Sequence, residues 1–193
     1  MPTLRPYGII PAALAFLLLA LLYALLSPTS ARSASAGYAL QFDGVDDQVV
    51  LTRTLTIMGP TWQTTKTVEL WVKPTGAEAF CPGADPAGCD VIMGDRPRWW
   101  GIARGTLGGQ DRIWVWNYDG NYDKIGIPYG TDEWIHVALV HGNGVLRALK
   151  NGIEVGNLPS GATQQPSTGA LPILHLGGII NNASRNWTFE GQL

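Results

Sequence analysis

One short stretch of the chain, RIWVWNY, carries the aromatic side chains whose spacing best suits ligand binding. Successive side chains of an extended strand point to opposite faces, so Trp114, Trp116 and Tyr118 share one face. Ile113 and Val115 occupy the other face, and both faces are therefore apolar. Such a strand is either covered on both sides or offers its aromatic face to a ligand.

If the aromatic face is open, its chemistry suits sugar recognition. The apolar faces of pyranose rings stack on aromatic rings, while amide and carboxyl side chains bond the hydroxyl groups. The predicted platform consists of Trp99, Trp100, Trp114, Trp116, Tyr118 and Tyr122, with Asn117, Asp119 and Asn121 as polar partners. The alternative is that Trp114 and Trp116 form the core, and that the segment 81–89 covers Ile113 and Val115. The sequence leaves both alternatives open.

Three carboxylates lie within five residues, at Asp43, Asp46 and Asp47. Calcium prefers hard oxygen ligands, so Asp43 and Asp47 are candidate Ca²⁺ ligands. Because Ca²⁺ takes about six to eight oxygen ligands, other groups would have to complete the site. The alternative is that these residues build a tight turn by accepting backbone N–H bonds.

The elements that must position these side chains are short and extended. Beyond residue 37 the chain shows little helical periodicity, but many runs of β-branched and aromatic residues separated by Gly, Pro, Asn and Asp. This pattern predicts an all-β protein. The predicted strands are 38–42, 48–51, 67–73, 90–93, 99–103, 112–118, 124–127, 134–141, 145–150, 153–155, 173–176 and 187–190.

Two hairpin turns are especially clear in the sequence. Asn143-Gly144 and Asn151-Gly152 supply the positive φ angles that a type I′ turn requires, which predicts a three-stranded meander over 134–155. A dozen short strands with this turn spacing predict a sandwich of two antiparallel sheets.

Several segments carry a family pattern in a fixed order. They are ALQFDGVDDQVVL at 39–51, TVELWVKP at 67–74, DEWIHVALVHGNGVLRALKNGIEVG at 132–156, LHLGG at 174–178 and WTFEGQL at 187–193. Together they resemble the laminin G-like, concanavalin A-like lectin/glucanase jelly-roll family. That resemblance implies a concanavalin A-like antiparallel jelly roll over 37–193, and many such domains hold a calcium ion near a sheet rim.

The chain departs from the family pattern at two places. An aromatic and an aliphatic residue usually precede the Asn-Gly turn, where this chain has Leu149 and Lys150. After F-x-G-x-L such domains continue with an acidic residue and a closing strand, whereas this sequence stops at Leu193. We therefore expect a jelly roll that lacks its last strand, within a fragment of a longer exported protein.

The resemblance includes glucanases, which place catalytic carboxyls on one strand at E-x-D-x-E or similar spacing. Retaining hydrolysis needs two carboxyls roughly 5 Å apart. The glutamates considered for this role are scattered singly, at Glu69, Glu78, Glu133, Glu154 and Glu190. The sequence has no nucleophile elbow or metal-binding His pair, and His136 is predicted to hydrogen-bond within the sandwich. We therefore expect a protein that is not an enzyme.

The N-terminus has the pattern of an export signal. An uncharged apolar run at 8–26 is followed by small residues, with the best cleavage site after Ala36 and a competing site after Ala31. The expected division is a leader at 1–36 and one domain at 37–193. Because the apolar run has 19 residues, an uncleaved membrane anchor is the alternative. Either outcome places the domain in an extracellular or cell-surface location.

Charge and cysteine content limit the classes of partner and of site that we expect. Removing the leader removes Arg5 and Arg32, which leaves 11 basic residues (13 minus 2) against 15 acidic ones, a net charge of about −4. No basic patch suggests nucleic acid. Cys81 and Cys89 lie in the turn-rich stretch CPGADPAGC, and they are predicted to form a disulfide rather than a metal site.

These features predict an exported, non-catalytic recognition module. Its expected partner is carbohydrate or a cell-surface glycoprotein, with Ca²⁺ as a candidate cofactor, and membrane contact is expected only through an uncleaved N-terminal segment. The alternative is a structural or adhesive spacer of a larger extracellular protein, with no small ligand.

Overall fold

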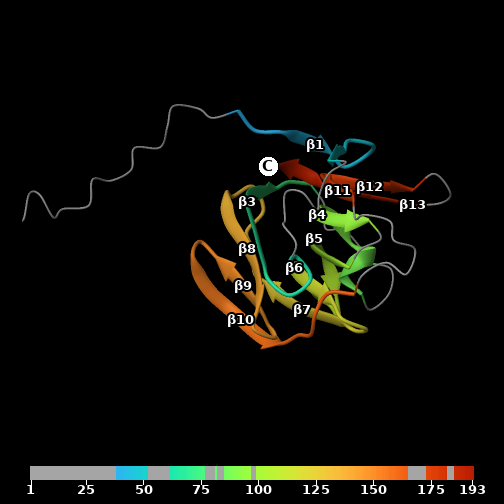
Figure 1. Cartoon of the computed structure of the whole chain (residues 1–193). Helices are drawn as coiled ribbons and strands as arrows, with labels where there is room; N and C mark the ends of the chain where they lie inside the picture. The colour runs from blue at the N-terminus through green and yellow to red at the C-terminus, as the bar shows by residue number, and fades with distance from the viewer. Residues whose placement is uncertain are drawn as a thin grey trace, which may run out of the picture. The chain divides into compact units, whose positions relative to one another are not determined.

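The computed structural model describes residues 38–51, 61–76, 81, 85–96, 99–164, 173–181 and 185–193. Over these residues the chain consists of strands and one short 3₁₀ helix (Figure 1). The predicted leader at 1–36 lies outside the described residues. Within the described part, no helix is long and apolar enough to cross a membrane.

One sheet has six strands. Their spatial order is β1 (Gln41–Asp43), β14 (Glu190–Gln192), β3 (Lys66–Pro74), β8 (Ile135–Gly142), β9 (Val145–Lys150) and β10 (Ile153–Pro159). All the pairings in this sheet are antiparallel.

The other sheet has eight strands. Its main path runs through β12 (Gly178–Asn181), β13 (Arg185–Thr188), β4 (Asp90–Arg96), β5 (Trp100–Leu107), β6 (Gln110–Tyr118) and β7 (Tyr122–Ile127). Off this path, β11 (Ile173–Leu176) pairs with both β4 and β2 (Val49–Leu51). The only parallel pairing among the described strands is one residue pair between β13 and β4.

The β8–β9–β10 meander follows directly from its turn residues. Asn143 and Gly144 have φ angles of 53° and 72°, and Asn151 and Gly152 have φ angles of 51° and 79°. These values are those of the type I′ turns that suit two-residue hairpins. The predicted meander is therefore confirmed.

The core lies between the two sheets. On β3, Val72 is fully buried and Val68 packs against the same core, while Ile113 and Val115 of β6 enter it from the other sheet. Each such buried side chain stabilises the fold by about 1.5–3 kcal/mol relative to an exposed one. The predicted antiparallel two-sheet sandwich is confirmed, and two outer sheet faces are left on which a ligand could bind.

Candidate functional site

The aromatic strand β6 is buried on both faces. Trp116 is fully buried and Trp114 is only 8 % exposed, so neither ring offers an open face. Both rings pack in a cluster with the two cysteines, Cys81 and Cys89, on the outer side of the eight-stranded sheet. The predicted disulfide between these cysteines is formed, with a Cα–Cα distance of 4.4 Å.

The structure corrects the predicted arrangement of the two faces. Ile113 and Val115 were expected beneath the 81–89 segment, but they enter the main core between the sheets. Trp114 and Trp116 belong instead to the smaller cluster with the disulfide. The reason is that this face acquires its own cover, since the helix η1 (Pro86–Gly88) contacts β5 and β6.

Glycines opposite the two tryptophans make room for their rings. Gly101 pairs with Trp116 across β5 and β6, and a methyl group on Gly101 would overlap the indole ring. Gly126 pairs with Trp114, and a Cβ there would lie 2.8 Å from that ring. Trp114 Nε1 also donates to the carbonyl of Gly105 at 2.8 Å. These side chains are therefore packed as a second core.

The other predicted platform members are divided between the faces. Trp100 is 1 % exposed within the main core, and the fully buried Asn117 lies opposite it in the β5–β6 register. Tyr118 and Tyr122 are half-buried and pair with ring centroids 4.8 Å apart. Trp99 is half-buried against the main core. The structure thus does not assemble these residues into one ligand platform.

An exposed aromatic surface occurs instead on the outer face of the six-stranded sheet. Trp71 of β3 is 57 % exposed, and Trp134, just before β8, is 42 % exposed. Trp71 pairs with His136 in the β3–β8 register, and the two rings lie 5.4 Å apart between centroids. We call this surface the outer aromatic patch and define it as Glu69, Trp71, Lys73, Asp132, Trp134 and His136.

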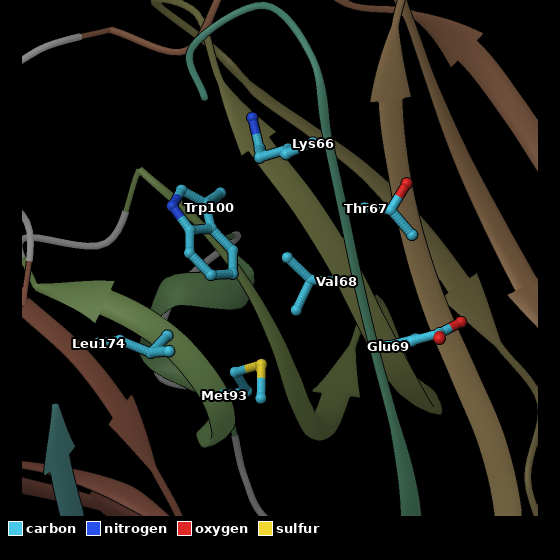
Figure 2. Close-up of a pocket in the computed structure, with 7 residues that line it drawn as sticks. All are labelled: Lys66, Thr67, Val68, Glu69, Met93, Trp100 and Leu174. Atoms are coloured by element: carbon cyan, nitrogen blue, oxygen red, sulfur yellow. The ribbon is translucent and has the colours of Figure 1, made fainter. Parts of the chain in front are cut away.

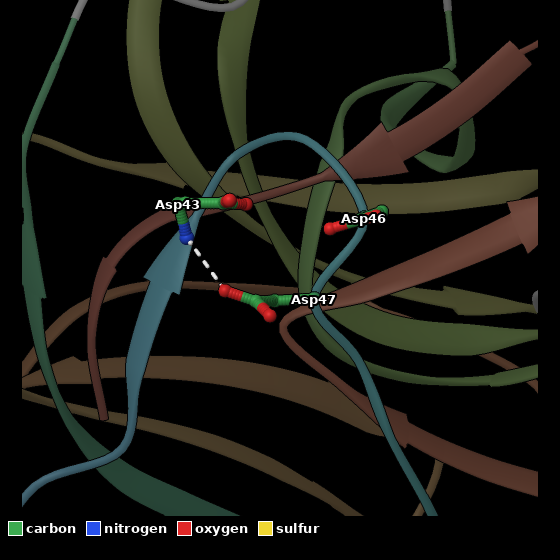
Figure 3. A group of neighbouring side chains, drawn as sticks. All are labelled: Asp43, Asp46 and Asp47. Carbon is green, nitrogen blue, oxygen red and sulfur yellow. Dashed lines mark hydrogen bonds between the residues drawn. The ribbon is translucent and has the colours of Figure 1, made fainter.

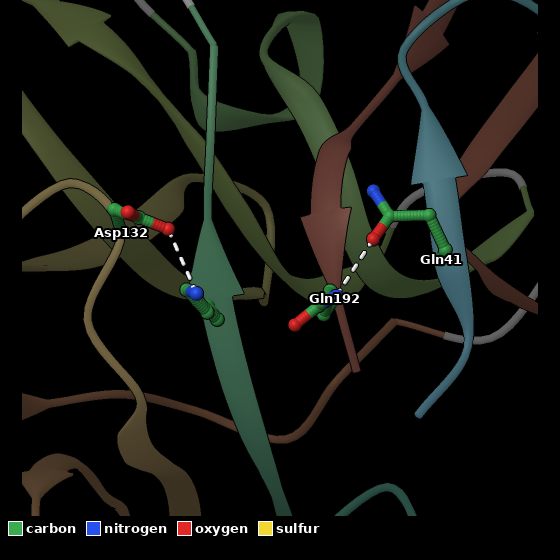
Figure 4. A network of polar contacts seen from close by, with 4 residues as sticks. Gln41, Asp132 and Gln192 are labelled. Atoms are coloured by element: carbon green, nitrogen blue, oxygen red, sulfur yellow. Dashed lines mark hydrogen bonds and ion pairs between the residues drawn. The ribbon is translucent and has the colours of Figure 1, made fainter. Parts of the chain in front are cut away.

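Charged groups flank these rings at close range. The Glu69 carboxylate lies 3.5 Å from His136 Nε2, and Lys73 Nζ lies 2.8 Å from the Asp132 carboxylate. Figure 4 shows this second ion pair beside β3. The backbone N–H of His136 donates to the Asn151 side chain at 2.9 Å, which ties the patch to the turn after β9. Stacking surfaces and hydroxyl-bonding carboxylates therefore lie together on one face.

Sequence reasoning missed the outer aromatic patch although a signal was present. His136 was predicted to bond within the sandwich, but its side chain lies on the outer face between Trp71 and Glu69. Alternation on β3 already places Glu69, Trp71 and Lys73 opposite the core residues of that strand. His136 is likewise opposite the buried Ile135. Pairing the outward-facing residues of β3 with those of β8 would have revealed the patch.

The acidic loop between β1 and β2 holds the predicted metal ligands. Asp43, Asp46 and Asp47 each offer an oxygen within 4.8 Å of the others. Figure 3 shows the three side chains around this loop. Asp47 Oδ2 accepts the N–H of Asp43 at 3.0 Å, and Asp43 Oδ1 accepts the N–H of Val45 at 2.8 Å. The loop therefore uses two carboxylate oxygens to build its own turn and leaves the remaining ones for a cation.

A groove of about 380 Å³ lies along β3, lined by Lys66, Thr67, Val68, Glu69, Met93, Trp100 and Leu174 (Figure 2). In Figure 2, Val68 turns toward the side chains of the other sheet, whereas Thr67 and Glu69 turn away from them. Neighbouring side chains leave a strand on opposite faces, so a groove that contacts four successive residues must run along the strand's edge. We call it the edge groove.

The edge groove borders a part of β3 that has one neighbour among the described strands. β8 pairs with β3 from Lys66 to Val72, and on the other edge β14 reaches only Lys73 and Pro74. The groove therefore presents strand backbone and apolar side chains, which suit another strand better than they suit a sugar.

Near one end of the edge groove lies a buried polar cluster. Lys66 Nζ donates to Asn117 Oδ1 at 3.0 Å and to Thr163 Oγ1. Burial lowers the pKa of Lys66 to about 8, although the charge of Asp95 acts in the opposite direction. Burial also raises the pKa of Asp95 to about 7, although two backbone N–H groups bond its Oδ1. The two side-chain partners of Lys66 come from distant parts of the chain, and this explains the cluster as a structural anchor.

Three side-chain types of a hydrolytic triad also meet in this region, at Ser160, His141 and Asp123. However, His141 Nε2 lies 3.2 Å from the Ser160 backbone carbonyl, and it is Asn117 that donates to the Ser160 hydroxyl, at 2.9 Å. Burial lowers the pKa of His141, and so does the charge of Lys66. Because a general base must reach the proton that it removes, this arrangement does not activate Ser160.

Comparisons with known proteins agree with this fold. The Laminin_G_3 family model, described as the concanavalin A-like lectin/glucanases superfamily, matches residues 43–193. A search of curated proteins gave no match. Among solved structures, the chain is similar to a "putative carbohydrate binding protein" from Bacteroides ovatus, with 18 % identity and a TM-score of 0.56. That match covers 80 % of this chain but only 40 % of the Bacteroides ovatus chain.

A second solved structure has the same fold. The heptameric SAP-like pentraxin from Limulus polyphemus matches with 14 % identity and a TM-score of 0.52, over 79 % of this chain and 70 % of the pentraxin. At such identities the structural likeness shows the fold alone. The family match spans most of the chain and agrees with the jelly-roll architecture predicted from the sequence. The chain therefore belongs to the concanavalin A-like lectin/glucanases superfamily.

Proposed function

We propose that this chain is a non-catalytic recognition module that binds carbohydrate through the outer aromatic patch. The observation that carries the proposal is the exposed Trp71 ring, which lies beside the tilted His136 ring and on the same face as the Glu69 carboxylate. An open indole can stack on the apolar face of a sugar ring, and nearby carboxylates can accept its hydroxyl protons. The similarity to a "putative carbohydrate binding protein" from Bacteroides ovatus supports this class of ligand.

Two observations support non-catalytic binding. In the outer aromatic patch, the Glu69 carboxylate faces His136 and the Asp132 carboxylate pairs with Lys73, so each carboxylate is engaged by a basic side chain and the two do not form a catalytic pair with each other. The Ser160 hydroxyl is also not hydrogen-bonded to the neighbouring histidine.

We further propose that the acidic loop binds Ca²⁺. The support is the donor set, since three carboxylates converge within 4.8 Å on an exposed loop. Asp43, Asp46 and Asp47 would supply oxygen ligands, and water would complete the coordination shell. In this proposal the ion would stabilise the loop between β1 and β2.

Export of the domain is proposed on two grounds. One is the apolar N-terminal run of the sequence, and the other is the Cys81–Cys89 disulfide, which persists in oxidising compartments. An exported domain at 37–193 would meet extracellular carbohydrate or the glycans of a cell-surface glycoprotein.

We also propose that an additional strand completes the six-stranded sheet. The edge groove supports this, because it exposes the backbone edge of β3 next to the apolar Val68, Met93 and Leu174. A strand in line with β14 would lie antiparallel to β3 and fill the groove. Appending an alternating apolar and polar segment after Leu193 should raise the melting temperature, whereas the same segment shifted by one residue should not.

A glycan array tests the carbohydrate proposal. Trp71→Ala should abolish the binding that the parent chain shows, because the stacking surface is removed. Ile153→Ala is the matched control, since Ile153 is 71 % exposed on β10 and lies outside the outer aromatic patch. A parent chain that is folded but binds no glycan would overturn the proposal and favour the structural spacer.

The array should be repeated with Ca²⁺ and with a chelator. If the acidic loop binds the ion, Ca²⁺ should raise the melting temperature of the parent chain but not that of Asp43→Asn/Asp47→Asn. An equal effect on both proteins would contradict calcium binding at this loop, while leaving sugar binding at the outer aromatic patch unaffected.

A further inference from the structure

The outer aromatic patch has a shape that selects one class of carbohydrate. We infer that it binds internal units of an uncharged polysaccharide chain rather than the terminal sugar of a glycan. This inference rests on the proposed sugar binding and specifies its ligand.

The first step is the position of the two tryptophans. Val72 pairs with Ile135, and the Asp132 N–H donates to the Pro74 carbonyl at 2.8 Å, so the chain before β8 continues beside β3. Trp134 directly precedes β8, and strand alternation continued past the buried Ile135 would place it on the same side as His136. Trp71 faces His136, so this placement would make Trp134 its diagonal neighbour.

This diagonal arrangement offers two stacking surfaces. Diagonal positions on neighbouring strands are about 7–8 Å apart, a distance that long aromatic side chains can bridge. The indoles of Trp71 and Trp134 can therefore contact different units of one sugar chain. His136 lies directly opposite Trp71 in the register, and Lys73 follows Trp71 by two residues on the same strand.

The second step is the openness of the patch. Trp71 is 57 % exposed and Trp134 is 42 % exposed, so neither ring is enclosed by the protein. A terminal sugar is best held by a concave site that surrounds it, because such a site buries most of the ligand surface. A flat face instead lets a chain continue past both rings, so that several weak stacking contacts add up.

The third step is charge. Lys73 is neutralised by Asp132 at 2.8 Å, whereas the Glu69 carboxylate is 63 % exposed beside His136. The complete sequence carries a formal net charge of −2. Acidic polysaccharides would therefore be repelled, while neutral sugars could offer hydroxyl donors to both carboxylates. This favours uncharged chains.

The test is calorimetric titration of the chain with neutral oligosaccharides of increasing length, prepared from whichever β-glucan, mannan or xylan the array identifies. We expect the hexasaccharide to bind at least about fivefold more tightly than the monosaccharide, because the second stacking contact becomes available. Polygalacturonate of matched length serves as the charged comparison and should bind more weakly.

Two variants separate the contributions of the rings. Trp134→Ala should reduce the gain in affinity from short to long oligosaccharides, while the affinity for the short ones should be retained. Trp71→Ala should abolish binding of both, and Ile153→Ala should change neither. The melting temperature of each variant checks that it is folded, and Trp71→Phe retains a smaller ring if Trp71→Ala unfolds.

The outcomes distinguish this inference from the proposed function. Equal affinity for monosaccharide and hexasaccharide would overturn the internal-unit assignment but leave sugar binding intact. Tighter binding of polygalacturonate would overturn the assignment of an uncharged ligand. Absence of any glycan binding by the folded parent chain would overturn the proposed function itself.

Discussion

Both sheets carry tryptophans on their outer faces, but the two faces have different environments. On the eight-stranded sheet, Trp116 is fully buried beneath the Cys81–Cys89 segment. On the six-stranded sheet, Trp71 is 57 % exposed. The same alternating pattern thus yields a second core in one place and an open surface in the other. A covering segment, and not the strand sequence, decides which of the two results.

The contrast between the two outer faces is tested most strongly by removing the buried Trp116 ring. Trp116→Ala should lower the free energy of unfolding by about 3–5 kcal/mol, because a large buried side chain is lost and a cavity remains. Chemical denaturation measures this change. A loss below about 1 kcal/mol would mean that this face is not a packed core.

Removing the disulfide of the covering segment should have the next largest effect on the free energy of unfolding. Replacing both Cys81 and Cys89 by serine should cost about 2–3 kcal/mol, since the disulfide closes a short loop with a sequence separation of 8. It should also accelerate hydrogen exchange at Trp114 Nε1, which now bonds the Gly105 carbonyl. Exchange that stays as slow as in the parent chain would show that other groups cover this ring.

Adding a methyl group beside the buried Trp116 ring provides a third test. Gly101→Ala should cost about 1–3 kcal/mol, because the added methyl group overlaps the Trp116 ring. Gly142→Ala is the matched control on β8, where the new Cβ would meet only Thr65, at 3.9 Å. Equal stability of the two variants, measured by denaturation, would contradict tight packing around Trp116.

The smallest effect on stability is expected at the open face. Trp71→Ala should lower the free energy of unfolding by no more than about 1 kcal/mol, because the ring is more than half exposed and loses mainly its cross-strand contact with His136. The same denaturation experiment measures this difference. A loss comparable to that of Trp116→Ala would show that Trp71 contributes to the core and would remove the contrast between the two faces.

The strand pattern was predictable because it depends on local chemistry. The Asn-Gly turns at residues 143 and 151 require positive φ angles, and the structure has them there. Alternation on β3 correctly separated Val72 from Trp71. Predicted strand ends were less accurate, and β12, with its partner β13, was not predicted in its observed form. These two strands pair mainly with each other in a hairpin, and a single residue pair joins β13 to β4.

The candidate site was harder to predict, because it depends on which face remains uncovered. The predicted platform used tryptophans of β5 and β6, which are buried, and it omitted Trp71 and Trp134, which are exposed. His136 was assigned to the interior, although the β3–β8 register places it beside Trp71. Only the pairing of two separate strands brings these rings together.

The sequence by itself determined the all-β fold, the Asn-Gly hairpins, the clustered carboxylates at Asp43–Asp47 and the disulfide partners. Each of these depends on residues that are close in the chain or on a simple periodicity. The tertiary structure decided which apolar face is covered and which charged groups flank the exposed one. Burial is a property of the whole fold, because a strand can only present a face, while a distant segment must arrive to cover it or leave it open.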